Sequence, residues 1–240
     1  MEERESREAR PGGALRTPRA AGAAGVLAAL LLAAVLIIVR VSLPSAVPTH
    51  AREWPAHSSH RQVLETALGL LPFSGIFFLW FMGAVRDYVG RTERGLGPAA
   101  NAVSGSEVER AENRFFATLF LCSGLMFTAL VLAAGAAAGG LLAITGDVPA
   151  GAQELWTYGR TTLNLLASYA MRMAAVFTLS TTTIGLGLRV FPHWLAVLGY
   201  AAALVLLFVV GAVPWTELAF PGWMLATSTY ILVVSSRARA

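Results

Sequence analysis

The chain has 240 residues, of which 56% are hydrophobic and only 13% are charged, and its mean hydropathy is +0.62. Soluble domains carry about 25% charged residues, so this composition excludes a soluble enzyme, a disordered chain and a disulfide-stapled secreted module. The 18 basic residues are all arginine, and the net charge is +4. Because a nucleic-acid-binding protein needs its basic patch on a soluble fold, we expect no nucleic-acid partner.

Six apolar windows are long enough to cross a membrane as helices. A helix needs about 20 mostly apolar residues to cross a hydrocarbon core of about 30 Å. In chain order, the windows cover residues 20–40, 64–85, 115–144, 161–186, 194–213 and 218–234. None shows the alternation of a barrel strand. We therefore predict an all-α fold, an integral membrane bundle of six transmembrane helices that forms one domain over residues 20–236.

The first window could be either a cleaved signal peptide or a retained helix. A signal peptide has an apolar region of about 7–15 residues, whereas residues 20–39 form a longer stretch without a charge. This length favours a retained helix. Residues 1–19 combine five arginines and four glutamates with Pro and Gly, which predicts a disordered cytoplasmic tail.

The second window contains a proline and is followed by a polar stretch. Pro72 leaves the carbonyl of Leu68 without its helical hydrogen bond and predicts a kink. Residues 91–111 are rich in Gly, Ser and charged side chains, a composition typical of a flexible connection. We predict a cytoplasmic insertion there, with a helix starting near Ser106.

The third window holds the single cysteine and a pair of glycines. Cys122 has no second cysteine to pair with, and we interpret it as a small buried hydrophobe. Gly135 and Gly139 form a GxxxG step, which lets another helix approach closely. Two interpretations stay open, namely packing inside the bundle and a seam between two copies of the chain.

Arg172 is the most informative residue of the fourth window. It lies 12 residues into that window, about 18 Å along the helix axis and so near the middle of the bilayer. A charged residue there costs at least about 2.5–3.5 kcal/mol on insertion scales, so it usually faces the bundle interior or a wet cavity. At helical spacing Asn164, Ser168, Leu179 and Thr182 share its stripe, and we predict that this polar stripe faces other helices.

The sequence supports two interpretations of Arg172. In the functional one, its guanidinium binds an anionic substrate group or a lipid phosphate, with Ser168 and Asn164 as further binding residues. In the structural one, its charge is satisfied by helix carbonyls, by hydroxyls such as those of Ser74 and Thr128, or by a lengthwise reach towards Glu65.

The distribution of arginine predicts the orientation of the chain, because cytoplasmic loops are enriched in basic residues. Thirteen arginines lie on the side of the N-terminal tail, four lie on the opposite side, and Arg172 lies within a window. We therefore predict that both termini are cytoplasmic. Four tryptophans fall near window ends, where indole rings prefer to lie; they are Trp80, Trp194, Trp215 and Trp223.

No motif of a known enzyme class is present. The chain has no HExxH, Walker-type loop, GxSxG or GxGxxG sequence. His50, His57 and His60 lie in one loop without a cysteine or acidic ligand at zinc-site spacing, so we interpret them as solvated. We expect no catalytic residue, no cofactor and no metal, and an enzyme is the weakest of the functional hypotheses.

Five segments carry a family resemblance, namely LPFSGIFFLWFMGAVRDYVG (71–90), ENRFFATLFLCSGLMF (112–127), YAMRMAAVFTLSTTTIGL (169–186), FPHWLAVLGYAAALVLL (191–207) and FPGWMLATSTYIL (220–232). They resemble a family of bacterial multi-pass integral membrane proteins that is common in high-GC actinobacteria and has no assigned chemistry. The resemblance covers most of residues 64–235 and implies a plasma-membrane protein of about six helices, with no catalytic residue to carry over. The insertion at residues 91–111 departs from the family pattern.

These observations lead to two main functional hypotheses. The first is a non-enzymatic integral plasma-membrane protein, either a structural accessory or a subunit of a larger assembly. The second is a small transporter or a lipid- or anion-binding protein that uses Arg172, Ser168 and Asn164. The expected partners are membrane lipids and either a second copy of the chain or another component of a membrane complex.

Overall fold

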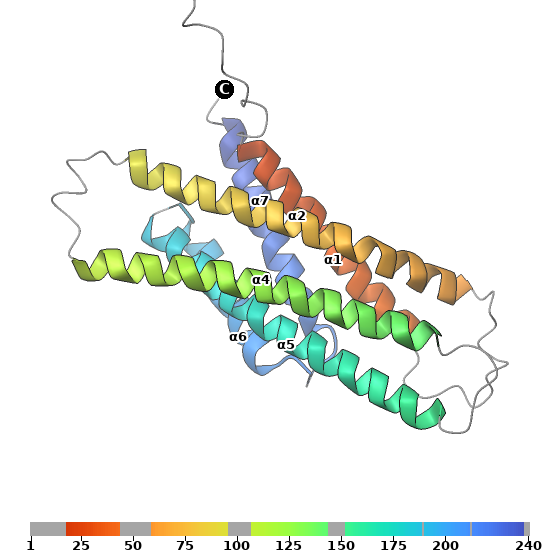
Figure 1. The fold of residues 1–240 in the computed structure, drawn as a ribbon. Coiled ribbons are helices and arrows are strands. Elements are labelled where there is room, and N and C mark those ends of the chain that lie inside the picture. Colours follow the sequence, from red (N-terminus) through yellow and green to blue (C-terminus); the bar gives the residue numbers. More distant parts are fainter. Residues whose placement is uncertain are drawn as a thin grey trace, which may run out of the picture.

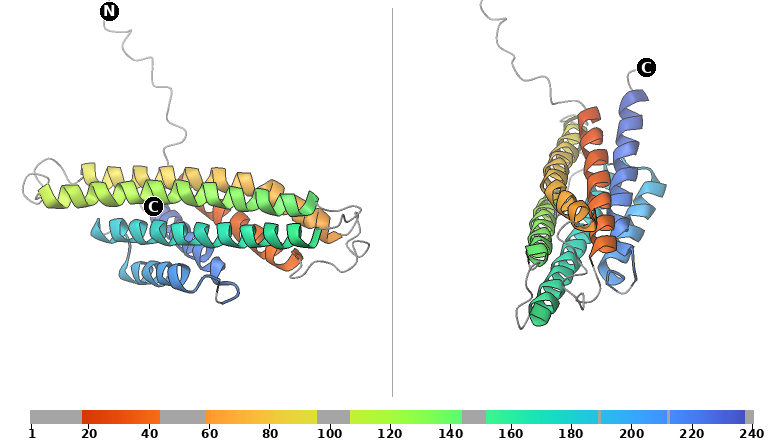
Figure 2. Two further views of the ribbon diagram at one scale, coloured as in Figure 1. Left: turned by 60° about the horizontal axis from the view of Figure 1, so that its bottom comes forward. Right: turned by 90° about the vertical axis from the view of Figure 1, so that its right-hand side faces the viewer.

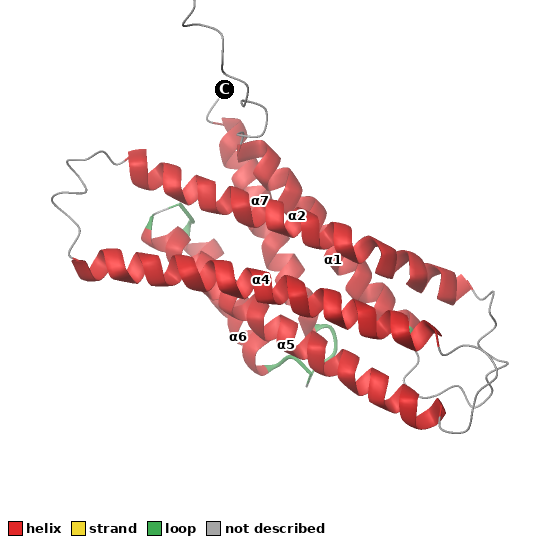
Figure 3. Ribbon diagram, viewed as in Figure 1, coloured by secondary structure: helices red, strands yellow, loops and turns green. Residues whose placement is uncertain are grey.

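Every regular element that the computed structural model describes is helical (Figure 3). The described residues are 18–43, 59–95, 107–143, 152–188, 190–211 and 213–237. In chain order, the elements are α1 (Pro18–Ser42), α2 (Ser59–Gly95), α4 (Glu107–Ala143), α5 (Ala152–Gly187), α6 (His193–Phe208), the short 3-10 helix η1 (Thr216–Leu218) and α7 (Ala219–Arg237). The predicted all-α fold is confirmed. Residues 1–17, most of the predicted tail, lie outside the described ranges.

Five of these helices are long and apolar enough to cross a membrane, namely α1, α2, α4, α5 and α7. Helix α6 has 16 residues, which gives a length of about 24 Å, less than the hydrocarbon core. The predicted fifth window, residues 194–213, was therefore too long. Its apolar sequence continues to Val213, but the helix ends at Phe208 and the chain turns at Gly211, whose φ is 91°, a value that favours glycine.

Three helices are much longer than their apolar windows. Helices α2 and α4 have 37 residues each and α5 has 36, lengths of about 55 Å. Figure 1 shows α2 and α4 projecting together at one end, which we call the inner end of the bundle after the orientation that the arginine distribution predicts. The opposite end is called the outer end. Helix α2 runs to Gly95 and α4 begins at Glu107, so both margins of the predicted 91–111 insertion are helical. Its centre lies outside the described residues.

The helices form two groups that cross each other. Helix α4 runs alongside both α2 and α5, whereas α1 and α7 lie side by side and run obliquely to these three, with α1 packed closely on α2 (Figures 1 and 2). Helix α6 packs on α5 and α7. Helix α1 belongs to the core, because Ala28, Ala29 and Leu32 are buried against the other helices.

An aromatic cluster fills the place where α2, α4, α5 and α7 meet. The ring of Phe177 lies 5.1 Å from that of Phe78 and 4.8 Å from that of Phe120. Phe127 and Phe220 extend the cluster with a centroid distance of 4.8 Å. Edge-to-face and offset ring pairs at such distances add about 0.5–1.5 kcal/mol each beyond the area they bury. The cluster therefore ties four helices together at one level.

Glycines allow the closest helix approaches. A Cβ atom added at Gly25 in α1 would lie 2.5 Å from the ring of Phe81, and one at Gly22 would lie 2.5 Å from Leu232. Of the predicted GxxxG pair, Gly135 contacts the side chain of Leu71, whereas Gly139 has open space around it. Gly135 thus packs inside the bundle, which is the first of the two interpretations for that residue.

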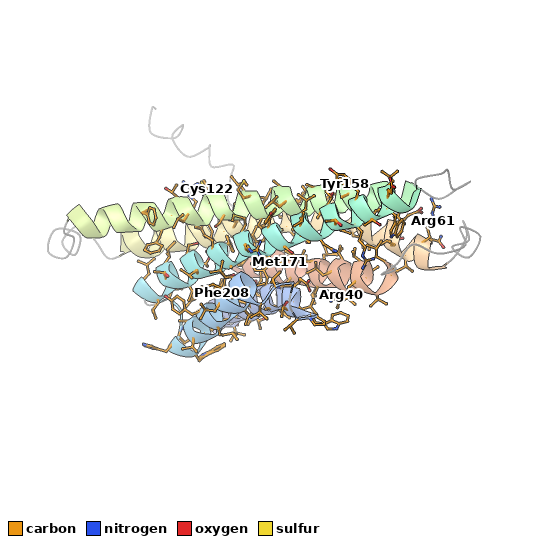
Figure 4. All side chains as sticks on the ribbon, turned by 90° about the horizontal axis from the view of Figure 1, so that it is seen from below. Arg40, Arg61, Cys122, Tyr158, Met171 and Phe208 are labelled. Carbon is orange, nitrogen blue, oxygen red and sulfur yellow. The ribbon has the colours of Figure 1, made fainter. Side chains whose placement is uncertain are left out.

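Two residues face the opposite way from our expectation. Cys122 is exposed on α4 (Figure 4), so its interpretation as a buried hydrophobe was wrong. Trp223 is buried and stacks on Phe220 with a centroid distance of 6.3 Å, so it is not an interfacial tryptophan. In a membrane protein the lipid-facing surface is as apolar as the core, and an apolar sequence does not reveal which face is inside.

The second window is one continuous helix through its proline. Helix α2 contains Pro72 without a break, and Pro72 itself is exposed. A cavity of about 10 Å³ lies beside the following turn, between Ser74 and Gly75 of α2 and Thr128 of α4. This volume is only about that of one water molecule.

Candidate functional site

The candidate site is centred on Arg172. It is the twenty-first of the 36 residues of α5, about 30 Å from the first residue of the helix and about 22 Å from the last. Its guanidinium carbon lies 5.7 Å from the centroid of the Tyr169 ring, within the range of a cation–π interaction. Among the described residues, we find no hydrogen bond or ion pair to Arg172.

The stripe of polar residues lies on the outward side of α5. Arg172 and Ser168 are half-buried, and Asn164 is exposed. Leu165 and Leu179, two turns away from Arg172 in either direction, are also exposed. The predicted orientation towards other helices was therefore wrong for Asn164, Ser168 and Arg172, whereas Thr182, at the far end of the same stripe, is buried against α6.

The inward side of α5 is occupied by a different set of residues. Met171, Ala174, Ala175, Phe177 and Thr178 are all buried, and α5 packs mainly against α4 and α6. Small and aromatic side chains fit closely against those helices, whereas a guanidinium there would lack a partner. The polar stripe is consequently left at the surface of the single chain.

The partners expected for Arg172 in the structural interpretation are engaged elsewhere. The Ser74 hydroxyl donates to the carbonyl of Ala28 at 3.4 Å, and the Thr128 hydroxyl donates to the carbonyl of Gly124 at 2.9 Å. Glu65 Oε1 accepts a hydrogen bond from Arg61 Nε at 2.7 Å. None of these three groups satisfies Arg172, so that part of the structural interpretation was wrong.

A second cavity, of about 60 Å³, lies near the inner end of the bundle. It is lined mainly by apolar side chains of α2, α4, α5, α7 and the connection between α5 and α6. Arg172 lines neither this cavity nor the small one beside Pro72. Neither of them is therefore the wet cavity that a transport path through Arg172 would require.

Buried polar atoms without a partner gather between α5, α6 and α7. We call this group the hydroxyl seam; its residues are Thr178, Thr182, Trp223 and Thr227. Thr182 Oγ1 contacts the backbone position of Gly199 in α6, and a Cβ atom added at Gly199 would lie 2.9 Å from Trp223 Nε1. Within the described part of the chain, none of the four side-chain polar atoms has a hydrogen-bond partner.

Sequence reasoning missed the hydroxyl seam. Its only signal is a repeat of polar or indole side chains four residues apart, Thr178 with Thr182 and Trp223 with Thr227. Other hydroxyls on α5 bond back to the helix, such as Ser180 to the carbonyl of Val176 at 2.8 Å. The sequence does not distinguish hydroxyls that hydrogen-bond within their own helix from hydroxyls that remain without a partner.

A polar contact at the outer end joins α1 to η1. Arg40 Nη1 lies 3.3 Å from Glu217 Oε1, and the guanidinium carbon of Arg40 lies 5.6 Å from the centroid of the Trp215 ring. Trp215 has a φ of 72°, a left-handed conformation that costs a non-glycine residue about 1–3 kcal/mol. Figure 4 labels Arg40 on α1. The contact brings the end of one candidate span to the start of another.

The histidine loop falls largely outside the described residues. His50 and His57 are not described, and His60 lies at the start of α2 without a described side chain. Across the described ranges, no group of three or more His, Cys, Asp or Glu side chains is placed to hold a metal ion.

Comparison with known proteins finds no match among protein-family models, curated proteins or solved structures. The functional proposal therefore depends on the geometry of the chain itself.

Proposed function

We propose that the protein is a non-enzymatic subunit of a larger membrane assembly, and that Arg172 on α5 docks a transmembrane helix of a different protein through a carboxylate. The observation that carries this proposal is a half-buried arginine near the middle of a candidate span, on the outward side of the bundle and without a counter-charge among the described residues. The proposed setting is a bacterial plasma membrane with both termini in the cytoplasm, in keeping with the arginine distribution and the family resemblance.

A lone arginine at this depth needs a compensating group. The free energy of inserting it into the membrane is at least about 2.5–3.5 kcal/mol unfavourable. A cation–π contact such as that with Tyr169 offsets only about 0.5–2 kcal/mol of this. Acyl chains offer no hydrogen-bond acceptor to the guanidinium. Charged residues within spans therefore usually pair with another charged group or with backbone carbonyls.

The position of Arg172 favours a carboxylate of a protein over a phosphate of a lipid. The middle of the hydrocarbon core lies about 15 Å from either head-group layer, a distance longer than an arginine side chain. A carboxylate on a neighbouring helix can be placed at the required depth and can accept two parallel hydrogen bonds from a guanidinium.

A second copy of the chain does not supply this carboxylate. The acidic residues within the candidate spans all lie near a span end: Glu65 in the second turn of α2, Glu154 in the first turn of α5 and Glu217 in η1 before α7. Two copies related by a two-fold axis through this face would also bring the two Arg172 side chains together, and like charges repel. The partner is therefore a different chain.

The rest of the face is suited to a helix partner. Asn164 and Tyr169 are exposed and Ser168 is half-buried, so their polar groups can hydrogen-bond across a helix interface, as such side chains do in membrane bundles. Leu165 and Leu179 supply apolar contact on the same face.

The proposal is tested by the size and composition of the native complex after mild detergent extraction. We expect the wild type to migrate with a partner in stoichiometric amount, Arg172→Lys to retain part of the complex, and Arg172→Gln to lose it while the monomer stays folded. Changing the facing partner carboxylate to arginine in an Arg172→Glu background should restore it. A complex that is unchanged in Arg172→Gln would contradict the proposal, and so would co-purification of an anionic phospholipid alone.

A further inference from the structure

We infer that the 60 Å³ cavity near the inner end of the bundle holds part of an acyl chain of an anionic membrane lipid, whose phosphate is bound by Arg86. This site is separate from Arg172, and the inference does not depend on the proposed docking of a partner protein.

The walls of the cavity select an apolar group. They include Val85 of α2, Ile184 of α5, Phe191 of the connection between α5 and α6, and Ile231 of α7. Thr181 also lines the cavity, but its hydroxyl already donates to the carbonyl of Phe177 at 2.7 Å. Apolar cavities stay dry and accept apolar ligands. The volume equals about four water-sized spheres, enough for the end or a bend of a hydrocarbon chain.

Arg86 supplies a cation at the edge of this apolar space. It lines the cavity, is exposed, and is the last residue of the candidate span Arg61–Arg86. No hydrogen bond or ion pair to its guanidinium is found among the described residues. The end of a span lies at the head-group layer, where lipid phosphates are found, and a guanidinium binds phosphate through two parallel hydrogen bonds.

The two features together match an amphiphile rather than a free anion or a neutral hydrocarbon. The apolar cavity binds the acyl chain, and the adjoining guanidinium binds the phosphate. Basic pockets between transmembrane helices on the cytoplasmic side are a known mode of lipid head-group recognition. A net negative head group is favoured over a zwitterionic one, because a choline cation would be repelled by the guanidinium.

One wall of the cavity is fixed by backbone geometry. The amides of Val190 and Phe191 both donate to the carbonyl of Gly185, at 2.9 and 3.1 Å. A Cβ atom at Gly185 would lie 2.5 Å from Cε2 of the Phe191 ring, so the absence of a side chain lets that ring pack onto α5. The cavity is therefore already formed in the single chain and needs no ligand to create it.

The experiment is lipid retention by the purified full-length protein, measured by native mass spectrometry after delipidation and addition of either dioleoyl phosphatidylglycerol or dioleoyl phosphatidylcholine. We expect the wild type to retain one phosphatidylglycerol with about tenfold higher affinity than phosphatidylcholine, a difference of about 1.4 kcal/mol. Arg86→Gln should remove this preference. Ala117→Phe, which fills the cavity from α4, should lower retention of both lipids.

A matched control keeps the result specific. Leu125→Phe adds a ring to an exposed position of α4 outside the cavity lining and should retain lipid as the wild type does. Equal retention of both lipids by the wild type, or an unchanged preference in Arg86→Gln, would overturn the inference. Displacement of the lipid by inorganic phosphate alone would also overturn the inference, because the acyl chain would then contribute nothing to the binding affinity.

Discussion

The guanidinium of Arg172 lies over the ring of Tyr169, with 5.7 Å between the guanidinium carbon and the ring centroid. Both residues are on the outward side of α5, and Tyr169 is exposed. The aromatic ring holds the charged group along the surface of the helix, and no ion pair to Arg172 is found among the described residues. A partner carboxylate would thus meet an arginine whose position is already restricted, which reduces the entropy lost on binding.

This contact makes a prediction for Tyr169. Tyr169→Phe keeps the ring face and should leave the native complex intact. Tyr169→Leu removes it and should weaken the complex by about 0.5–2 kcal/mol, the range of a cation–π interaction, while leaving more complex than Arg172→Gln does. Quantitative native electrophoresis of the three variants would measure the order, and a Tyr169→Leu complex that is as strong as the wild type, or lost as completely as in Arg172→Gln, would contradict it.

The aromatic cluster makes a prediction for stability. Phe177 is fully buried and contacts aromatic side chains from three other helices. Phe177→Ala should lower the free energy of unfolding by about 3–5 kcal/mol, as large-to-small core substitutions do. Thermal or denaturant unfolding in detergent would measure this loss. Phe115, which is 60% exposed, is the matched control, and Phe115→Ala should change the stability little.

The sequence predicted the helices better than it predicted their faces. Length and apolar composition were sufficient for the all-α fold, because each candidate span must satisfy its backbone groups within one helix. They were not sufficient to predict whether Arg172, Cys122 and Trp223 face the core or the surface. Lipid is as apolar as a protein core, so either side of a helix can face it. The end of α6 was missed because its apolar composition continues beyond Phe208, whereas the turn depends on the backbone at Gly211.

The hydroxyl seam predicts a substitution that stabilises the protein. A buried hydroxyl without a partner costs about 1–3 kcal/mol, so Thr182→Val, which keeps the shape of the side chain, should raise the free energy of unfolding by about 1 kcal/mol. Thr183→Val is the matched control, because the Thr183 hydroxyl is hydrogen-bonded to Tyr200 at 3.2 Å, and it should lower stability. A loss of stability in Thr182→Val would show that an internal water or another ligand occupies the seam.

The contact at the outer end should contribute little to stability. The side chain of Arg40 is 41% exposed, and that of Glu217 is 23% exposed, and ion pairs of this kind contribute about 0–1 kcal/mol. Glu217→Gln should therefore lower the thermal midpoint only slightly, and Arg40→Gln, which also removes the contact with Trp215, somewhat more. High salt should reduce the difference between wild type and Glu217→Gln. A large fall in the thermal midpoint of Glu217→Gln at any salt concentration would contradict the small contribution assigned to this ion pair.

The orientation of the chain has its own test. The start of α1 packs beside the end of α7, where Gly22 meets Leu232, so both lie at one end of the bundle although α6 is short. Thirteen of the 18 arginines lie on the predicted side of the termini, which predicts that a C-terminal reporter active only in the cytoplasm is active and that one active only outside it is silent. The reverse result would contradict the predicted topology. It would also move Arg86 to the outer leaflet, without changing the position of Arg172 within the span.

The most direct measurement is site-specific photo-cross-linking in native membranes, with the cross-linker placed at Leu165 or Leu179 beside Arg172. Leu125 on α4 is the control, because it is as exposed as Leu165 but lies on another helix. We predict that both α5 positions capture one and the same membrane protein, that Leu125 does not, that Arg172→Gln abolishes the product, and that the captured helix carries an acidic residue within its span. Cross-links to lipid alone, to a second copy of this chain, or to a protein whose capture is independent of Arg172 would contradict the proposed function.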